Sequence, residues 1–154
     1  MTTRTRKIIV CLILTCFASI RACTDDEYYI IRSKASNGLV LDGEDQAQIR
    51  IQHFTGFSTQ LWKLERGNKA GLFYIVSKHS GRVMDIVNSY NIYLNEKNGA
   101  LVQQWVLKDK GRIMNAEKRL NVDVQNANFT PGATVQICSD NGSQAQKFVL
   151  QKKT

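Results

Sequence analysis

Few residues of this 154-residue sequence are spaced as catalytic groups would be. Acidic residues adjoin at 25–27 and 42–45, but acidic pairs in polar loops are usually solvated. His53 and His79 stand alone, without the paired spacing of a metal site, and there is no glycine-rich phosphate loop. A catalytic site needs a base, an orienting group and a nucleophile or metal within reach, so we predict a non-catalytic protein without metal or cofactor.

The polar and aromatic residues recur instead with a period of 43 residues. Each copy ends in glutamine, any residue, an aromatic residue, any residue and leucine. The glutamine, aromatic and leucine residues of the three copies are Gln60, Trp62 and Leu64; Gln103, Trp105 and Leu107; and Gln146, Phe148 and Leu150. Such a period indicates one supersecondary unit used three times, each too small to bury its own apolar face.

Short apolar alternations broken by Gly, Asn, Asp and Ser fill each copy, and none has a sustained helical period. They predict twelve strands, at 28–33, 38–42, 48–54, 60–65, 72–77, 82–87, 91–96, 104–108, 111–115, 119–124, 133–139 and 147–151. Four strands in each of three repeats, about 28–66, 72–108 and 111–151, predict an all-β chain with pseudo-threefold symmetry. The expected fold is a β-trefoil, a six-stranded barrel closed at one end by three hairpins.

The third copy differs from the other two in its spacing. Eighteen residues separate Asp42 from Gln60, and also Asp85 from Gln103, whereas 25 separate Asn121 from Gln146. We therefore expect Asn121 to occupy the position of the two aspartates, with seven residues added in the loop at 126–132.

Residues 1–22 read as a secretory signal peptide followed by a single domain at 23–154. A charged start precedes a 13-residue apolar run at 8–20, which is too short to span a bilayer core of about 30 Å. Cleavage after Ala22 would yield a secreted, extracellular protein with no membrane span, although a signal anchor is the alternative. It would also lower the formal charge from +8 to +4, less than a nucleic-acid-binding surface needs.

Two kinds of covalent modification fit an oxidising secretory route. Cys23 and Cys138 would remain in the cleaved chain, and they either pair in a disulfide or stay apart with Cys138 as a small buried residue. Asn128 and Asn141 begin glycosylation sequons, the first of them weakened by Pro131.

The three glutamine–aromatic elements resemble the QxW repeats of ricin-B-type lectins, and the resemblance extends over 28–151. Segments 36–42 and 80–85 likewise resemble the family's "SGxxLD" element. The resemblance implies a β-trefoil whose aromatic residues fill the barrel and whose glutamines bond backbone groups at the repeat junctions.

The resemblance also implies a sugar site in each repeat, built from the Asp of the LD element, a stacking aromatic, and an Asn just before the QxW glutamine. By this comparison the stacking positions are Gln52, Asn95 and Cys138, and the residues before the glutamines are Thr59, Val102 and Ala145. We expect the second repeat to compensate, because one hairpin carries acceptors, donors and a ring. The candidate carbohydrate-binding residues are Asp85, Asn88, Tyr93 and Asn95, followed by Asp42, Gln52, His53, Asn121 and Gln136.

Two functions follow from this pattern. The first is a lectin-like module that binds glycans or glycoproteins, with galactose or N-acetylgalactosamine as the sugar implied by the family. The second is a trefoil that has lost its sugar sites and binds another protein, because a fold does not determine a function. In the second case Asp42 and Asp85 would only cap tight turns.

Overall fold

The protein is described by a computed structural model covering residues 27–35 and 38–154. The described chain is all-β, with twelve strands and five short 3-10 helices. The strands are β1 (Tyr29–Ser33), β2 (Leu39–Asp42), β3 (Arg50–His53), β4 (Trp62–Arg66), β5 (Phe73–Ser77), β6 (Val83–Val87), β7 (Asn91–Asn95), β8 (Trp105–Leu107), β9 (Ile113–Asn115), β10 (Asn121–Val124), β11 (Val135–Cys138) and β12 (Phe148–Lys152). The 3-10 helices are η1 (Ser58–Gln60), η2 (Leu101–Gln103), η3 (Asp109–Gly111), η4 (Gln125–Ala127) and η5 (Gln144–Gln146).

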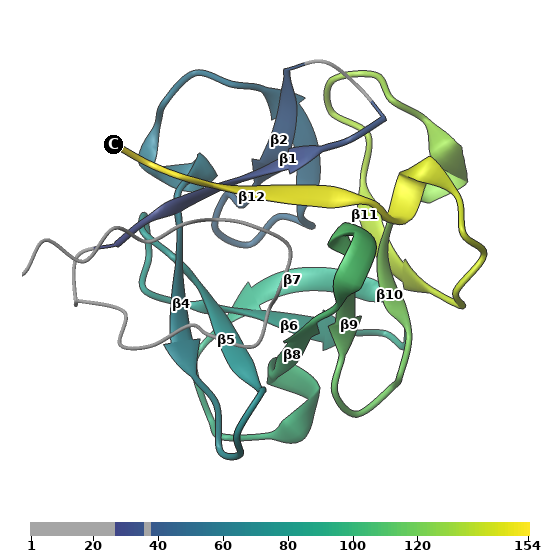
Figure 1. Ribbon diagram of the computed structural model, residues 1–154. Coiled ribbons are helices and arrows are strands. Elements are labelled where there is room, and N and C mark those ends of the chain that lie inside the picture. The colour runs from purple at the N-terminus through teal and green to yellow at the C-terminus, as the bar shows by residue number, and fades with distance from the viewer. Residues whose placement is uncertain (1–26, 36–37) are drawn as a thin grey trace, which may run out of the picture.

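The twelve predicted strands are confirmed, each within two residues at either end. Antiparallel ladders join β12 to β1, β1 to β4, β4 to β5, β5 to β8 and β8 to β9. Three hairpins, β2–β3, β6–β7 and β10–β11, extend from this series. The first and last strands, β1 and β12, lie side by side across the face shown in Figure 1.

Equivalent aromatic side chains from the three repeats fill the core. Trp62, Trp105 and Phe148 are each at most 1% exposed, as the repeat pattern predicted. The indole of Trp62 donates to the carbonyl oxygen of Leu41 at 3.3 Å, and that of Trp105 donates to Met84 at 3.1 Å. These hydrogen bonds fix the first and second hairpins to the barrel, since a buried indole N–H needs an acceptor.

Close backbone packing joins η3 to the last strand. Gly111 has a φ of +83°, and a Cβ added there would lie 2.2 Å from the carbonyl oxygen of Phe148. Glycine satisfies both constraints because it tolerates positive φ and has no side chain to displace its neighbour.

The hairpin registers show which residues of the three repeats are equivalent. Leu41 pairs with Ile51, Met84 with Leu94, and Val122 with Ile137. The residues that follow, Asp42, Asp85 and Asp123, therefore occupy one position.

The prediction that Asn121 takes this position is wrong, because its pairing with Cys138 makes it equivalent to Val40 and Val83. Asn121 and Asp123 lie two residues apart, so strand alternation places both on one face and could not separate them. The third hairpin is accordingly longer by five residues and not seven, because Gln146 lies 23 positions after Asp123 whereas the other two glutamines lie 18 positions after their aspartates.

Several expectations for the N-terminus lie outside the described residues, including the signal peptide at 1–22, its cleavage after Ala22, and Cys23. Cys138 is a half-buried free thiol in the structure, so its disulfide with Cys23 stays a prediction. Within 27–35 and 38–154, no helix is long and apolar enough to cross a membrane.

Candidate functional site

A buried glutamine organises the base of each hairpin in the same way. Gln60, Gln103 and Gln146 are at most 1% exposed. Each side-chain amide donates to the carbonyl oxygen seven residues earlier, at His53, Glu96 and Ser139, over 2.7–2.9 Å. Each amide oxygen accepts from the backbone N–H five residues earlier, at Thr55, Asn98 and Asn141, over 2.8–3.2 Å. The expectation that these glutamines bond backbone groups at the junctions is confirmed.

In the first two repeats the glutamine also binds the aspartate of the hairpin. Gln60 donates to Asp42 Oδ2 at 2.9 Å, and Gln103 donates to Asp85 Oδ2 at 3.1 Å. Both aspartates are buried, and the second oxygen of each, Oδ1, has no hydrogen-bond partner. The hydrogen bonds from the glutamines thus reach Asp42 and Asp85 from 18 positions away in the sequence. An aspartate that only caps its own turn would instead bond the backbone of that turn. A buried carboxylate oxygen without a donor is costly and is a natural acceptor for a ligand hydroxyl.

The residue opposite the aspartate distinguishes the three hairpins. Arg50 faces Asp42, Tyr93 faces Asp85, and Gln136 faces Asp123. Directly opposed residues of an antiparallel pair have Cβ atoms about 5 Å apart, within reach of one small ligand.

The stacking positions expected from the resemblance were therefore wrong. Gln52, Asn95 and Cys138 pair with Val40, Val83 and Asn121 instead of with the aspartates. At the corrected position the second repeat carries an aromatic ring.

In the second hairpin the structure brings three of the four preferred residues together. Asp85 is 8% exposed, Tyr93 is half-buried opposite it, and Asn95 donates from Nδ2 to Asp85 Oδ2 at 3.1 Å. Asn88 is separated from them, because it lies in the exposed turn beyond β6 with a φ of 52°. The site therefore offers a ring, a carboxylate oxygen without a partner and an exposed amide.

The first hairpin has no ring opposite its aspartate. The guanidinium of Arg50 forms an ion pair with Glu44, on the turn of the same hairpin. Gln52 is half-buried and His53 is exposed, and His53 contributes its main-chain carbonyl oxygen to Gln60. The structure does not bring Gln52 or His53 into a site with Asp42 by any described hydrogen bond.

The third hairpin contains Asp123, which the sequence comparison missed. The signal was present, because Val122-Asp123 repeats the apolar–Asp pair of the other copies, although it lies five residues farther from the apolar alternation that follows. Burial raises the pKa of the Asp123 carboxyl, and hydrogen bonds from Gln146, Gln136 and Asn141 oppose that rise. Asp123 Oδ2 has no hydrogen-bond partner.

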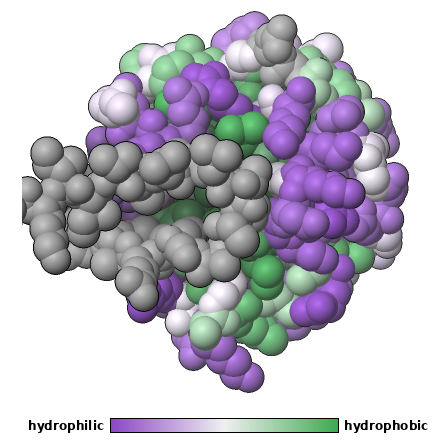
Figure 2. Space-filling view, viewed as in Figure 1, coloured by the Kyte–Doolittle hydropathy of each residue, from purple (hydrophilic) through white to green (hydrophobic). Residues whose placement is uncertain are grey.

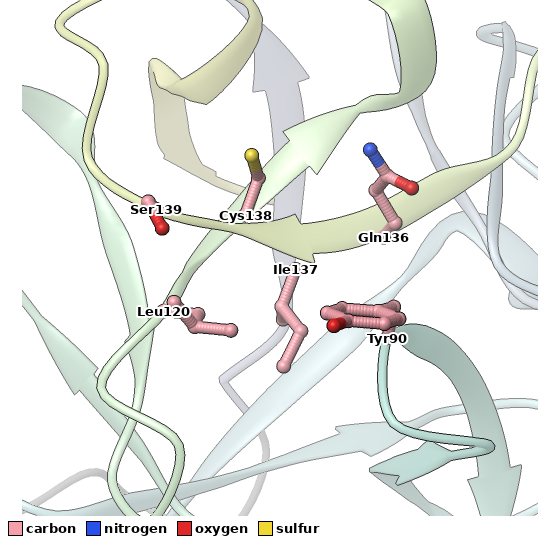
Figure 3. Close-up of a pocket in the computed structure, with 6 residues that line it drawn as sticks. All are labelled: Tyr90, Leu120, Gln136, Ile137, Cys138 and Ser139. Atoms are coloured by element: carbon pink, nitrogen blue, oxygen red, sulfur yellow. The ribbon is translucent and has the colours of Figure 1, made fainter.

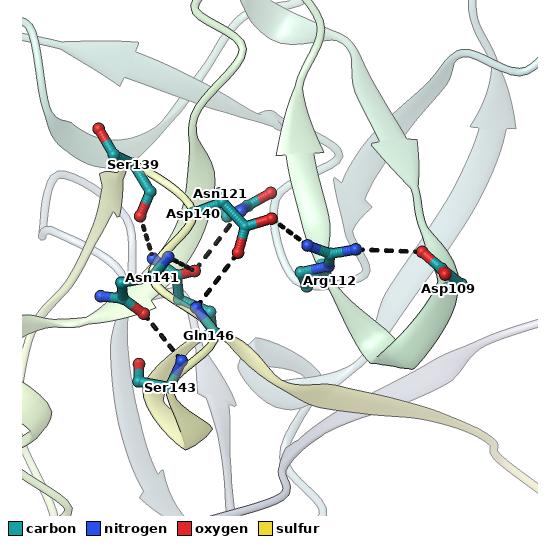
Figure 4. Close-up of polar contacts among 9 residues, drawn as sticks. Asp109, Arg112, Asn121, Ser139, Asp140, Asn141, Ser143 and Gln146 are labelled. Carbon is teal, nitrogen blue, oxygen red and sulfur yellow. Dashed lines mark hydrogen bonds and ion pairs between the residues drawn. The ribbon is translucent and has the colours of Figure 1, made fainter.

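Figure 4 shows the polar contacts beside this hairpin. Gln146 binds Ser139 and Asn141, and Asn121 donates to Gln146 Oε1 at 3.5 Å. Arg112 lies between Asp109 and Asp140 and forms an ion pair with each. Asn121 thus contributes to the scaffold, away from the ligand position that the sequence suggested for it.

A cavity of about 300 Å³ lies between the second and third hairpins. Its lining residues are Tyr90, Leu120, Gln136, Ile137, Cys138 and Ser139. Figure 3 shows Tyr90, Leu120 and Ile137 on one side of β11, and the side chains of Gln136 and Cys138 directed to the other. Tyr90 therefore does not supply the ring that Gln136 lacks opposite Asp123.

Among residues 27–35 and 38–154, no three His, Cys, Asp or Glu side chains converge as a metal-binding group.

Comparison with known proteins places these hairpins in a family. The model for "Ricin-type beta-trefoil lectin domain-like" matches residues 18–105, more than half of the sequence. The chain belongs to this ricin-type β-trefoil lectin-like family. No match was found among curated proteins.

Solved structures share the trefoil fold of this lectin-like chain. The designed threefold-symmetric protein ThreeFoil is 28% identical, with a TM-score of 0.74, over 80% of this chain and 96% of that one. The exo-β-1,3-galactanase 1,3Gal43A from Clostridium thermocellum is also 28% identical, with a TM-score of 0.74, over 82% of this chain and 30% of that one. A Polyporus squamosus lectin bound to Neu5Acα2-6Galβ1-4GlcNAc is 18% identical, with a TM-score of 0.70, over 81% of this chain and 48% of that one. The chain thus spans nearly all of ThreeFoil but less than half of the two natural proteins.

Proposed function

We propose that this lectin-like chain is a secreted, non-catalytic carbohydrate-binding module whose principal site is the β6–β7 hairpin. The observation that carries the proposal is the direct pairing of Tyr93 with Asp85, whose Oδ1 is buried and without a partner. Neither of the other two hairpins has a ring at this place.

The chemistry of the pair suits a sugar ring. The apolar C–H face of a sugar packs on an aromatic ring, while its hydroxyl groups donate to a carboxylate. Asp85 Oδ1 would accept one hydroxyl hydrogen, and the bonds from Gln103 and Asn95 to Oδ2 hold the carboxylate in place. The exposed amide of Asn95 offers a further acceptor, its Oδ1, to the same sugar.

Galactose or N-acetylgalactosamine is the proposed sugar class. The support is the resemblance to the lectin family together with the galactanase, which at 28% identity is named for a galactose polymer. A single pair of this kind gives weak affinity, since a small ligand gains at most a few contacts.

A protein partner is the second candidate. Phe57 is 71% exposed and Tyr90 is 58% exposed, and exposed aromatic residues often anchor protein interfaces. Protein binding that survives changes at Asp85 and Tyr93 would favour this candidate.

Secretion and glycosylation belong to the same proposal. The apolar run at 8–20 supports secretion, and both sequon asparagines, Asn128 and Asn141, are exposed. Expression in a secreting cell line, with mass determination before and after removal of N-glycans, tests both steps.

A glycan array tests the sugar site, followed by titration of the retained glycan against three variants. Tyr93→Ala and Asp85→Asn are each expected to weaken binding by about tenfold or more, the value of roughly 1.4 kcal/mol. Asp42→Asn is the matched control, because Asp42 has the same glutamine contact but no ring opposite it. Retention of no glycan, or equal losses in the Asp42 and Asp85 variants, would contradict the proposal.

A further inference from the structure

The outward face of the β1–β12 ladder concentrates positive charge. We define the cationic face as Arg32, Lys34, Lys78, Lys147 and Lys153. Within 27–35 and 38–154, no carboxylate lies within 4 Å of any of these five side chains. The described ion pairs involve other cations, namely Arg50, Lys63, Arg82, Lys97, Arg112, Lys118 and Lys152. Arg66, Lys69, Lys108, Lys110 and Arg119 also lack an ion pair among the described residues, so the cationic face is distinguished by the clustering of its unpaired cations.

Aromatic rings take the place of carboxylates on this face. The Arg32 guanidinium lies 5.0 Å from the centre of the Phe54 ring, and the Lys153 ammonium lies 5.9 Å from it. The Lys78 ammonium lies 4.5 Å from the centre of the Tyr28 ring. A cation over a ring gains attraction but keeps its full charge, so the surface stays positive.

Backbone contacts place four of the cations along one strip, and Lys78 joins it through the Tyr28 ring. Lys153 N–H donates to the Tyr28 carbonyl oxygen at 2.7 Å, and Lys34 N–H donates to Lys147 at 2.9 Å. Arg32 pairs with Val149, between these two points. With a rise of roughly 3.3 Å per residue, the line from Lys147 to Lys153 is about 20 Å long.

Two features of the strip indicate that its positive charges are not balanced within the protein. Lys34 and Lys147 lie beside one another across the ladder, and like charges in that arrangement are destabilising. Arg32 donates from Nε to Gln151 Oε1 at 2.6 Å, a neutral acceptor that leaves its charge uncompensated. A bound anion would offset the repulsion between Lys34 and Lys147 and would compensate the charge of Arg32.

We propose that the cationic face binds a linear acidic polysaccharide, at a site separate from the β6–β7 sugar site. A line of cations about 20 Å long matches a chain with repeated anionic groups better than it matches one small ion. Gln151 and the rims of Tyr28 and Phe54 add hydrogen-bonding and apolar contacts of the kind that sugar rings use. In Figure 2, which shows the face that β12 crosses, hydrophilic residues surround smaller hydrophobic patches.

The test measures binding to three polysaccharides at about 0.15 M salt, where long-range attraction is largely screened. The probes are heparin, which carries sulfate groups, hyaluronan, which carries only carboxylates, and neutral dextran. Heparin is expected to bind, and dextran is expected not to bind. Binding to hyaluronan as well would show that the face accepts carboxylates, whereas binding to heparin alone would assign it to sulfate esters. Tighter binding to anionic vesicles or duplex DNA than to either acidic polysaccharide would overturn the proposal.

Two triple variants locate the site. Arg32→Gln/Lys147→Gln/Lys153→Gln should lower heparin affinity by about tenfold or more, because three charge contacts are lost together. Arg66→Gln/Lys69→Gln/Lys108→Gln removes the same charge elsewhere and should change affinity by less than about twofold. Equal losses in the two variants would mean that only net charge matters, which contradicts the proposal.

A double variant distinguishes loss of binding from loss of folding. Arg32 packs on Phe54, whereas Lys34 and Lys147 have no described ring contact, so Lys34→Gln/Lys147→Gln should weaken heparin binding without lowering the melting temperature. Asp85→Asn should leave heparin binding intact, and the face variants should keep their affinity for the neutral glycan. Failure of one site is therefore distinguishable from failure of the other.

Discussion

Gln103 donates its side-chain amide to Asp85 Oδ2 at 3.1 Å, which joins the residue that defines the sequence repeat to the carboxylate of the candidate sugar site. The two oxygens of Asp85 have separate environments. One is held by Gln103 and Asn95, and the other is buried without a partner. A scaffold role and a ligand role are therefore compatible in one side chain, and the presence of the glutamine contact does not argue against sugar binding.

Removal of the glutamine should destabilise the hairpin. In Gln103→Leu the backbone N–H of Asn98 and the carbonyl oxygen of Glu96 lose their partners, and Asp85 loses one of two donors. Each buried polar group left unpaired costs about 1–3 kcal/mol, so we expect the free energy of unfolding to fall by about 3 kcal/mol. Urea denaturation measures this change. Gln144→Leu, at an exposed position of η5, is the control and should stay within about 0.5 kcal/mol of the parent.

A ring placed opposite Asp123 should create a second sugar site. Gln136 pairs with Asp123 as Tyr93 pairs with Asp85, and Asp123 Oδ2 is likewise without a partner. Gln136→Tyr is expected to raise the number of glycans bound per chain from one to two, measured by native mass spectrometry with the glycan found on the array.

Gln136→Leu is the matched control for that change, since it removes the same amide but adds no ring. A stoichiometry of one in Gln136→Tyr, with the fold intact, would show that the ring and the carboxylate do not suffice.

The stability contributed by Asp123 should depend on pH. Its pKa in the folded protein is raised above the ordinary value of 3.8, mainly by burial, so the folded state holds the proton more tightly than the unfolded state does. Ionisation of Asp123 therefore lowers the free energy of unfolding. This loss is complete above the pKa of the folded protein and absent below about pH 3.8.

Asp123→Asn removes that ionisation. The stability of the variant relative to the parent should increase as the pH rises from about 3.5 to 7, measured by urea denaturation at each pH. Asp45→Asn, at an exposed position between β2 and β3, controls for the loss of one negative charge. A relative stability of Asp123→Asn that is constant or falls with pH would contradict the raised pKa.

The sequence period predicted the barrel well because its strongest signals come from buried residues. Trp62, Trp105 and Phe148 must fill equivalent space, so their spacing cannot drift without loss of packing. The glutamines are constrained in the same way, because each one satisfies backbone groups seven and five residues earlier.

The ligand-facing positions were harder to predict, because a hairpin can change length without disturbing the barrel. The longer third loop allowed Asn121 to be aligned where Asp123 lies, since both point to the same side of β10. Tyr93 lies opposite Asp85 because of the pairing register of β6 and β7, and the QxW spacing alone does not determine that register. Only the cross-strand pairs Leu41–Ile51, Met84–Leu94 and Val122–Ile137 fix that register.

Gly111 and Gly71 provide a matched test of close backbone packing. Both have positive φ, +83° and +82°, so an alanine costs roughly 1 kcal/mol at either position for conformation alone. A Cβ at Gly71 would meet no atom within 4 Å, whereas one at Gly111 would lie 2.2 Å from the carbonyl oxygen of Phe148.

We expect Gly71→Ala to lower the free energy of unfolding by about 1 kcal/mol and Gly111→Ala to lower it by about 3 kcal/mol or more. The difference arises because the contact is with backbone, and η3 can move away only by disturbing β12 at the core residue Phe148. Thermal and urea unfolding of the two variants measure it. Equal losses would show that η3 is not held against the last strand, and that the barrel tolerates displacement at this point.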